Sequence, residues 1–471
     1  MSSTESIELT HIRHANSQAS FTVINSSSGA VDISEESIAI QRQEVDGEEE
    51  SEDEYYPEGG WRAYLVIFGS FLGLIVNLGV INSIGAVQAY VSTHQLALVD
   101  ATSISWIFSI YLALAYALGS IVGPIFDRRG PLELLIASTL LIFVGLMASA
   151  NSTKVYHFIL SFVALGVGNG IGMTPLIGVI SHWFNKKRGN FTGIATSGGS
   201  VGGLVFPLML RHTYAQYGFV WAMRIFAFVC LGCMVLSIFL VKGRFKRESK
   251  KHDVQYFKSK WNNGIENFSI ANVWAASTSK FAFLIAGAFF GELSLVLLLT
   301  YFATYAMAQG VSEANSLLLL TVWNATGILG RWIPGYLSDY VGRFNINILM
   351  LFSFNVSIFV LWLPFGSSLK VLFAFAAIGG YCSGSILSLL PACLSQITPV
   401  NEIGTKYGFL NTILSIGNLV GLPIASAVIQ NGSTHNYNNF VVFVGLLSVL
   451  GTVFWYTSRF MIVGNRLNVK V

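Results

Sequence analysis

Long apolar segments separated by short polar stretches run from residue 63 to residue 462. About twelve of these segments are long enough to cross the roughly 30 Å hydrocarbon core of a bilayer as helices. The predicted spans are 63–89, 103–125, 132–150, 155–183, 190–211, 219–241, 280–307, 314–338, 345–366, 371–397, 407–429 and 438–461. A polar stretch at 242–279 divides them, so the pattern predicts an all-α polytopic membrane protein with two halves of six helices each.

Composition supports the membrane assignment. Charged residues make up 11 % of the 471 residues, whereas an ordinary soluble domain has roughly 25 %. The four cysteines lie in apolar spans, which predicts buried thiols rather than disulfides. The sequence has no metal-spaced His/Cys cluster, nucleophile elbow or paired catalytic carboxylates. We therefore expect no enzymatic activity, no metal or cofactor, and no nucleic-acid partner.

The charged residues are segregated by region. Residues 1–57 are polar and acidic and cannot bury enough apolar surface to fold, so we predict a disordered tail. Lys and Arg accumulate in alternate connections, as they do in cytoplasmic loops, which places both termini in the cytoplasm. The predicted parts are a tail at 1–57, a first half at 58–241, a basic cytoplasmic loop at 242–279, a second half at 280–462 and a cytoplasmic tail at 463–471.

A short phrase is repeated at the ends of two spans, one in each half. Its residues are Gly123, Asp127, Arg128, Arg129 and Gly130 in the first copy, and Gly335, Asp339, Gly342 and Arg343 in the second. Repeated helical halves in a membrane are typical of transporters. An aspartate at a helix end can bind the N-terminus of a neighbouring helix, and the glycine permits a tight reversal. We predict that the phrase forms a cytoplasmic gate; the alternative is a generic charged turn.

Charges inside the spans point to a transport site, because each costs roughly 2.5 to 3.5 kcal/mol at mid-bilayer on insertion scales. Only Glu292, Arg224 and Arg331 lie well inside a span. Arg224 is close to the outer end of its helix, so we interpret it as an interfacial anchor. We predict that Glu292 and Arg331 are near neighbours facing a central cavity, and that Arg331 contacts an anionic or carbonyl-bearing solute. The alternative is a buried pair that only locks two helices together.

Two further motifs carry a family resemblance. Their residues are Pro57, Glu58, Gly59, Gly60 and Trp61 before the first span, and Trp183, Lys186, Lys187 and Arg188 before the fifth. With the repeated phrase, they make the chain resemble the major facilitator superfamily and, within it, the monocarboxylate porter family. Segments 150–161, 291–294, 330–339 and 382–391 resemble the fungal branch that includes plasma-membrane riboflavin transport. The resemblance implies alternating access at the plasma membrane; the vacuole or another internal membrane is the alternative.

The chain departs from the monocarboxylate pattern at two positions. Asn82 stands where the resemblance would place a substrate-binding lysine, and Gly327 where it would place a proton-linked aspartate, whereas Arg331 is retained. The predicted cavity residues are Arg331, Glu292, Asn82, Asn169, Tyr301 and Asn324. The neutral members of this set suit hydrogen bonding to a larger polar heterocycle.

We therefore predict a transporter of a small organic solute, first of all facilitative riboflavin uptake. The second prediction is monocarboxylate transport, for which Glu292, the only mid-membrane carboxylate, is available as a proton-coupling group. A remote alternative from another functional class is a non-transporting membrane sensor.

Overall fold

The computed structural model describes residues 56–244, 278–430, 433–464, 466 and 469–470. Nearly all of the predicted acidic tail and most of the basic central loop lie outside these ranges. Within them, every regular element is an α, 3-10 or π helix, which confirms the all-α prediction. The domain boundaries expected from the sequence stay predictions.

The first half comprises the helices before the central loop. They are α2 (Trp61–Thr93), α3 (Ala101–Ala117), α4 (Gly119–Arg129), α5 (Leu132–Ala150), α6 (Val155–Gly178), η1 (Val179–His182) and α7 (Arg188–Leu240). α7 covers the two predicted spans 190–211 and 219–241. The backbone between them departs from helical geometry only at Gly218, with φ 70°. Glycine adopts this left-handed conformation without steric cost.

The second half comprises the helices after the central loop. They are α10 (Ser279–Ala308), α11 (Glu313–Val341), α12 (Arg343–Val356), η2 (Ser357–Trp362), α13 (Leu363–Phe365), α14 (Leu369–Leu394), η3 (Val400–Glu402), α15 (Ile403–Ile429) and α16 (Thr434–Val463). The π helix η2 joins α12 to α13 without leaving the span Arg343–Phe365.

Ten helical segments of the described chain are long and apolar enough to cross a membrane. The segment Arg188–Leu240 counts once among them, although Gly218 divides it into two helices. The 29-residue α11 is not among the ten. It is long enough to cross a membrane, but polar residues such as Asn324, Arg331 and Asp339 make it less apolar. With α7 divided and α11 included, the described residues contain the arrangement expected from the sequence.

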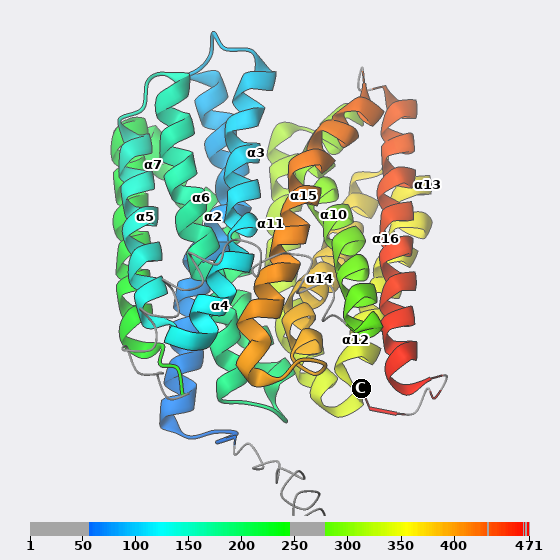
Figure 1. Ribbon diagram of the computed structural model, residues 1–471. Coiled ribbons are helices and arrows are strands. Elements are labelled where there is room, and N and C mark those ends of the chain that lie inside the picture. Colours follow the sequence, from blue (N-terminus) through cyan, green and yellow to red (C-terminus); the bar gives the residue numbers. More distant parts are fainter. Residues whose placement is uncertain (1–55, 245–277, 431–432, 465, 467–468, 471) are drawn as a thin grey trace, which may run out of the picture. The chain divides into compact units, whose positions relative to one another are not determined.

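Two helix interfaces join the halves. Inside the first half, α2 packs on α7 and α5 on α6, and inside the second half α10 packs on α16 and α11 on α14. Across the halves, α11 packs on α7, and α15 packs on α3 and α4 (Figure 1). The first interface therefore pairs one helix from each half, the second pairs α15 with two shorter helices, and both carry residues of the repeated phrase.

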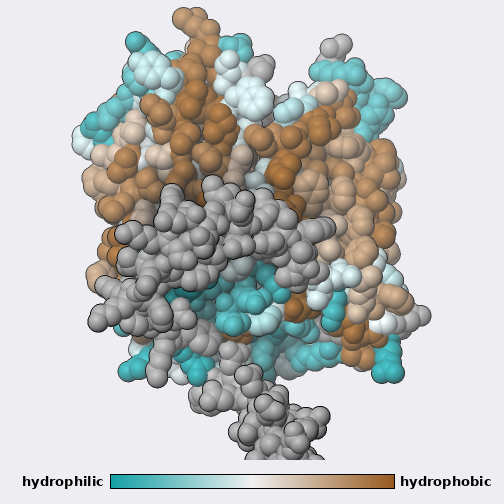
Figure 2. Space-filling view, viewed as in Figure 1, coloured by the Kyte–Doolittle hydropathy of each residue, from teal (hydrophilic) through white to brown (hydrophobic). Residues whose placement is uncertain are grey.

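The outer surface matches a membrane environment. Large apolar side chains such as Leu140, Phe239, Phe352 and Val453 are exposed along the helices. Figure 2 shows hydrophobic residues over the sides of the helices and hydrophilic ones near both ends. In lipid this apolar surface is the favourable one, so its exposure needs no protein partner.

Candidate functional site

Asp127 binds the start of a helix in the opposite half. Glu402, the residue before α15, makes no capping hydrogen bond with its side chain. Instead the Asp127 carboxylate accepts hydrogen bonds from the backbone N–H groups of Gly404 at 2.8 Å and Thr405 at 2.7 Å. The Thr405 hydroxyl donates a third, also at 2.7 Å. The helix N-terminus favours this negative charge, so Asp127 ties α4 to α15.

Asp339 makes the corresponding contact in the other direction. Lys187 does not cap α7 with its side chain, and Asp339 at the end of α11 accepts from the N–H groups of Gly189 at 2.9 Å and Asn190 at 2.8 Å. Each half thus supplies an aspartate that caps a helix of the other half. We call the end of the bundle where Asp127 and Asp339 lie the aspartate end, and in this conformation it is closed.

Arginines add contacts at the same place. Arg343 lies 3.5 Å from an Asp339 carboxylate oxygen and also donates to the Asn185 carbonyl. Arg188 donates to the carbonyl of Ser395, in the other half, at 2.9 Å and to that of Phe184 at 2.7 Å. Both arginines therefore link the residues around the start of α7 to the second half.

The remaining residues of the repeated phrase have local roles. Gly130 and Gly342 follow α4 and α11 with φ of 79° and 113°, the left-handed conformation expected for a tight reversal. Arg129 lies 3.7 Å from Glu133 at the start of α5, within the first half. Arg128 is exposed. Asp127, Asp339 and Arg343 of the phrase bind backbone groups of the opposite half.

Glycines let the helices meet backbone to backbone beside the aspartates. A Cβ at Gly123 would overlap the Gly404 carbonyl, and one at Gly189 would overlap Ser338 and the Gly335 carbonyl. Gly119 and Gly408 meet in the same way one turn away from Gly123 and Gly404. Small residues at such contacts are what close helix packing requires in a membrane.

Arg331 lies deeper in the same interface between α7 and α11. Its side chain is buried, with the residue 5 % exposed, and its guanidinium donates to the Thr196 carbonyl of the opposite half at 2.8 Å. Its Nε has no hydrogen-bond partner. The described chain therefore holds this charge with a backbone dipole and leaves one buried donor unused.

Glu292 is buried in the second half, and its nearest polar neighbours are tyrosines. Tyr116 of α3 and Tyr407 of α15 lie near enough to interact electrostatically with its carboxyl group. No ion pair joins Glu292 to Arg331 among the residues that the structure describes. Tyr116 interacts with both, so the two expected neighbours are linked through a residue of the first half.

Sequence reasoning missed Tyr116 and Tyr407. Their chain positions resemble those of many aromatic residues that pack in apolar spans. The available signal was chemical: a phenol buried in a membrane span needs a hydrogen-bond partner. Asn411 lies one turn from Tyr407 on α15 and offers an amide on the same side of that helix.

Asn82 and Asn324 come together where three helices meet. Asn82 of α2 donates to the Gly199 carbonyl of α7 at 3.1 Å. A Cβ at Gly203 would lie 2.9 Å from the Asn324 side-chain oxygen and 2.9 Å from the Asn82 Cβ, so both side chains lie against Gly203 of α7. Asn82 is exposed and Asn324 half-buried, which leaves polar groups available there.

Two predicted cavity residues lie inside single halves instead. Asn169 is buried among α2, α3 and α6, and donates to the Asn77 carbonyl at 3.2 Å and to the Tyr111 hydroxyl at 2.6 Å. Tyr301 donates to the Leu422 carbonyl at 3.3 Å, which joins α10 to α15. In this conformation both residues hold helices of their own half together.

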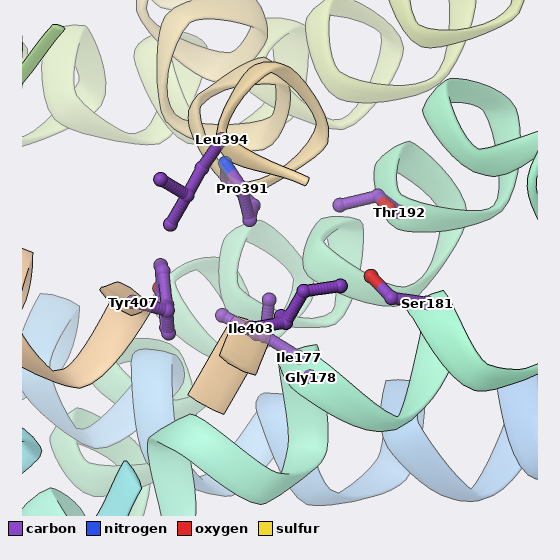
Figure 3. A pocket seen from close by; sticks show the side chains of 8 residues that line it. All are labelled: Ile177, Gly178, Ser181, Thr192, Pro391, Leu394, Ile403 and Tyr407. Carbon is purple, nitrogen blue, oxygen red and sulfur yellow. The ribbon is translucent and has the colours of Figure 1, made fainter. Parts of the chain in front are cut away.

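A small cavity remains between the halves near the aspartate end. Its volume of about 10 Å³ is close to the room that one water needs. Ser181 and Thr192 line it from the first half, and Pro391, Leu394 and Tyr407 from the second (Figure 3). No larger solute fits there while this end is closed. At the opposite end the surface is notched between the halves (Figure 2).

The two signature motifs lie against each other in the first half. The backbone N–H of Glu58 donates to the Trp183 carbonyl at 3.3 Å, and the Glu58 carboxylate accepts from the backbone of residues 185–187. Gly59 leads into Gly60, which has φ 94° just before α2. The side chains of Trp61, Lys186 and Lys187 are exposed, whereas Arg188 is buried.

The profile of the Major Facilitator Superfamily matches residues 63–368 and 335–461. The chain belongs to this superfamily. A solved structure of a proton:xylose symporter has the same fold, with a TM-score of 0.64 at 14 % identity over 84 % of this chain and 95 % of that one. The shared fold confirms the one inferred from the sequence. The family match, with the relatives described next, makes the chain a membrane transporter rather than an enzyme.

Curated relatives narrow the branch. The chain is 40 % identical to the riboflavin transporter MCH5 of Saccharomyces cerevisiae, over 89 % of this chain and 82 % of that protein. It is 32 % identical to the MFS transporter asaE of Aspergillus flavus, over 92 % and 95 %. It is 31 % identical to the fujikurins efflux protein of Gibberella fujikuroi, over 88 % and 86 %. The resemblance to the fungal riboflavin-transporter branch is thereby confirmed.

Proposed function

We propose that this protein carries riboflavin, or a closely similar polar heterocycle, into the cell across the plasma membrane by facilitated diffusion. The observation that carries the proposal is the 40 % identity to a riboflavin transporter over 89 % of the chain. The other two relatives are 31 to 32 % identical to the chain, and one of them is an efflux protein. The higher identity to the riboflavin transporter therefore favours the riboflavin branch.

The interface between the halves suits such a solute. Asn82 and Asn324 offer amide donors and acceptors, and Arg331 offers a cation whose only hydrogen bond in the described chain is to a backbone carbonyl. A flat ring with several carbonyl oxygens and N–H groups can pair with both kinds of side chain. The proposed binding residues are Arg331, Asn82 and Asn324. Asn169 and Tyr301 would support the helices that present them.

Alternating access follows from the closed aspartate end. In the proposed orientation this end and both termini face the cytoplasm, so the conformation described is closed to the cytoplasm. Solute would enter from the notched end and bind between the halves. Opening toward the cytoplasm would then break the contacts of Asp127 and Asp339 and part the glycine-lined interfaces.

The decisive experiment measures uptake of labelled riboflavin and labelled lactate in cells that lack their own carriers, across pH and with or without an uncoupler. We expect saturable riboflavin uptake that the uncoupler does not reduce. An absence of riboflavin uptake from cells with verified surface protein would refute the proposal.

Monocarboxylate transport coupled to protons is the second candidate, and Glu292 is the observation that favours it. A buried carboxyl group with one oxygen unpartnered and no cation beside it can bind a proton in one conformation and release it in another. Lactate uptake that the uncoupler abolishes, and that Glu292→Gln makes insensitive to pH, would put this candidate first.

A further inference from the structure

Glu58 binds three consecutive backbone N–H groups. Its Oε1 accepts from Asn185 at 2.8 Å and Lys186 at 2.5 Å, and its Oε2 accepts from Lys187 at 3.2 Å. Hydrogen bonds to a carboxylate are stronger than those between neutral groups. The connection between η1 and α7 is therefore held by a residue that precedes α2, well over a hundred positions earlier in the chain.

The residues that follow this connection bind Asp339. Glu58 accepts hydrogen bonds from the N–H groups of residues 185–187, and Asp339 accepts them from those of Gly189 and Asn190. One short stretch of backbone thus serves two carboxylates, one from each half. Because only Arg188 separates the two groups of donors, the position of the connection limits where the N–H groups that bind Asp339 can lie.

The backbone at Glu58 has an unusual conformation. Its φ of 51° lies in the left-handed region, which costs energy for a residue with a side chain. Such a conformation persists only where surrounding contacts enforce it. The contacts here are the three hydrogen bonds of the carboxylate and the one from its own N–H to Trp183.

The corresponding connection in the second half is built differently. Before α15 the chain makes the 3-10 turn η3, in which the Glu402 N–H donates to the Pro399 carbonyl at 3.1 Å. The Asp127 site is therefore shaped by a local turn, whereas the Asp339 site is shaped by a distant side chain.

We propose that Glu58 is a positioning residue for closure of the aspartate end: it holds residues 185–187 so that Asp339 can bind α7. Glu58 and this connection belong to the same half, so their contact persists when the halves part. It acts on the equilibrium between conformations, not on the solute. The inference rests on the gating role proposed for Asp339.

The test measures the accessibility of cysteines introduced on the two sides of the interface, in protein reconstituted in lipid nanodiscs. Thr192→Cys reports on the closed cavity near the aspartate end, and Asn82→Cys reports on the opposite, exposed side. Both are labelled with a membrane-impermeant maleimide, and protein with only the native cysteines gives the background. Riboflavin is not needed, so failure of the solute assignment would leave this result unaffected.

Glu58→Gly removes the carboxylate, and glycine adopts a φ of 51° without steric cost. We expect labelling of Thr192→Cys to rise about tenfold, because a displaced connection weakens the charge-assisted hydrogen bonds that Asp339 makes in the closed state. Labelling of Asn82→Cys should fall, because the opposite side closes as the aspartate end opens. A variant that merely loosened the fold would raise both rates instead.

Glu58→Gln keeps the shape and removes the charge, and we expect a smaller change of the same sign. Glu133→Gln is the matched control: it removes a carboxylate at the same end and should leave both rates unchanged. If Glu58→Gly does not reach the membrane in folded form, Glu58→Gln decides the question. Unchanged or jointly raised labelling in the deciding variant would overturn the proposal.

Discussion

Arg331 carries a full charge, and a solute can replace its hydrogen-bond partner. Its guanidinium binds the Thr196 carbonyl across the interface, and its Nε is unpaired. An arginine is planar and remains charged even when buried, so a solute carbonyl or anion can take the place of the Thr196 carbonyl and use the free donor as well. The same side chain would then hold the halves together without solute and contact solute when it is bound.

Replacing Arg331 with Gln should abolish uptake, because the neutral amide retains neither the charge nor the fork of donors. Arg331→Lys should keep only a small part of the activity, since an ammonium group lacks the planar fork of N–H donors that a guanidinium has. Initial uptake rates normalised to surface protein give the measurement. Arg224→Gln is the control, because Arg224 donates to Asn151 between α5 and α6 at 3.1 Å, away from the interface. Normal uptake by Arg331→Gln would show that the residue does not contact the solute.

At the scale of helices, closure depends on glycine pairs. Gly123 with Gly404 and Gly119 with Gly408 allow α4 to approach α15 on the backbone, and Gly189 with Gly335 does the same for α7 and α11. A side chain at any of these positions obstructs the closed conformation more than an open one, since the neighbouring backbone has moved away in the latter.

Gly123→Val should therefore lower uptake at least about tenfold by preventing closure of the aspartate end, the penalty expected for overpacking a tight contact. Gly232→Ala is the matched control. Gly232 lies in α7 with nothing within 4 Å of an added Cβ, and alanine should stabilise the helix by about 0.5 to 1 kcal/mol. Uptake and thermal unfolding of both variants are compared, and wild-type uptake by Gly123→Val would contradict the role given to this contact.

The sequence predicted the helices well because apolar length is a strong signal in a membrane. Span 132–150 coincides with α5 (Leu132–Ala150), and the repeated phrase correctly marked two helix ends. The separate spans expected at 190–211 and 219–241 agree with Gly218, whose non-helical backbone divides α7 into two helices. Sequence reasoning grouped Asn169 with the interface residues, because the direction in which a polar side chain points inside an all-apolar helix depends on packing.

The interface contacts themselves were only partly predictable. Asp127 and Asp339 were expected to bind helix N-termini, but which helices they reach depends on how the two halves meet. Tyr116 between Glu292 and Arg331 depends on the same long-range packing, as does the contact between the two signature motifs. Hydrogen bonds to backbone groups leave no trace in residue identity, so sequence patterns cannot reveal them.

At the scale of the whole molecule, the two aspartates act on one equilibrium. They lie in separate interfaces, and closure of the aspartate end forms both sets of hydrogen bonds together. The Asp339 set includes the backbone N–H groups of Gly189 at 2.9 Å and Asn190 at 2.8 Å, and the Asp127 set includes the Thr405 hydroxyl at 2.7 Å. Independent contributions to a single two-state change should add.

Asp127→Asn and Asp339→Asn should each weaken closure by about 1.5 to 3 kcal/mol, because each replaces charge-assisted hydrogen bonds with neutral ones. The double variant should show nearly the sum. Labelling of Thr192→Cys in the two single variants and the double variant measures this. If the double variant labels no faster than either single one, the aspartates do not share an equilibrium.

The aspartates of the gate bind main-chain N–H groups, and every amino acid except proline supplies such a group. At Asn190 the donor to Asp339 is the backbone alone, so the identity of that side chain is irrelevant to the bond. Closure consequently rests mainly on helix ends, and the Thr405 hydroxyl is the side-chain donor that adds to them at Asp127. A first half joined to the second half of a relative with another cargo should still close, which lets cargo preference be exchanged by recombination without rebuilding the mechanism that moves it.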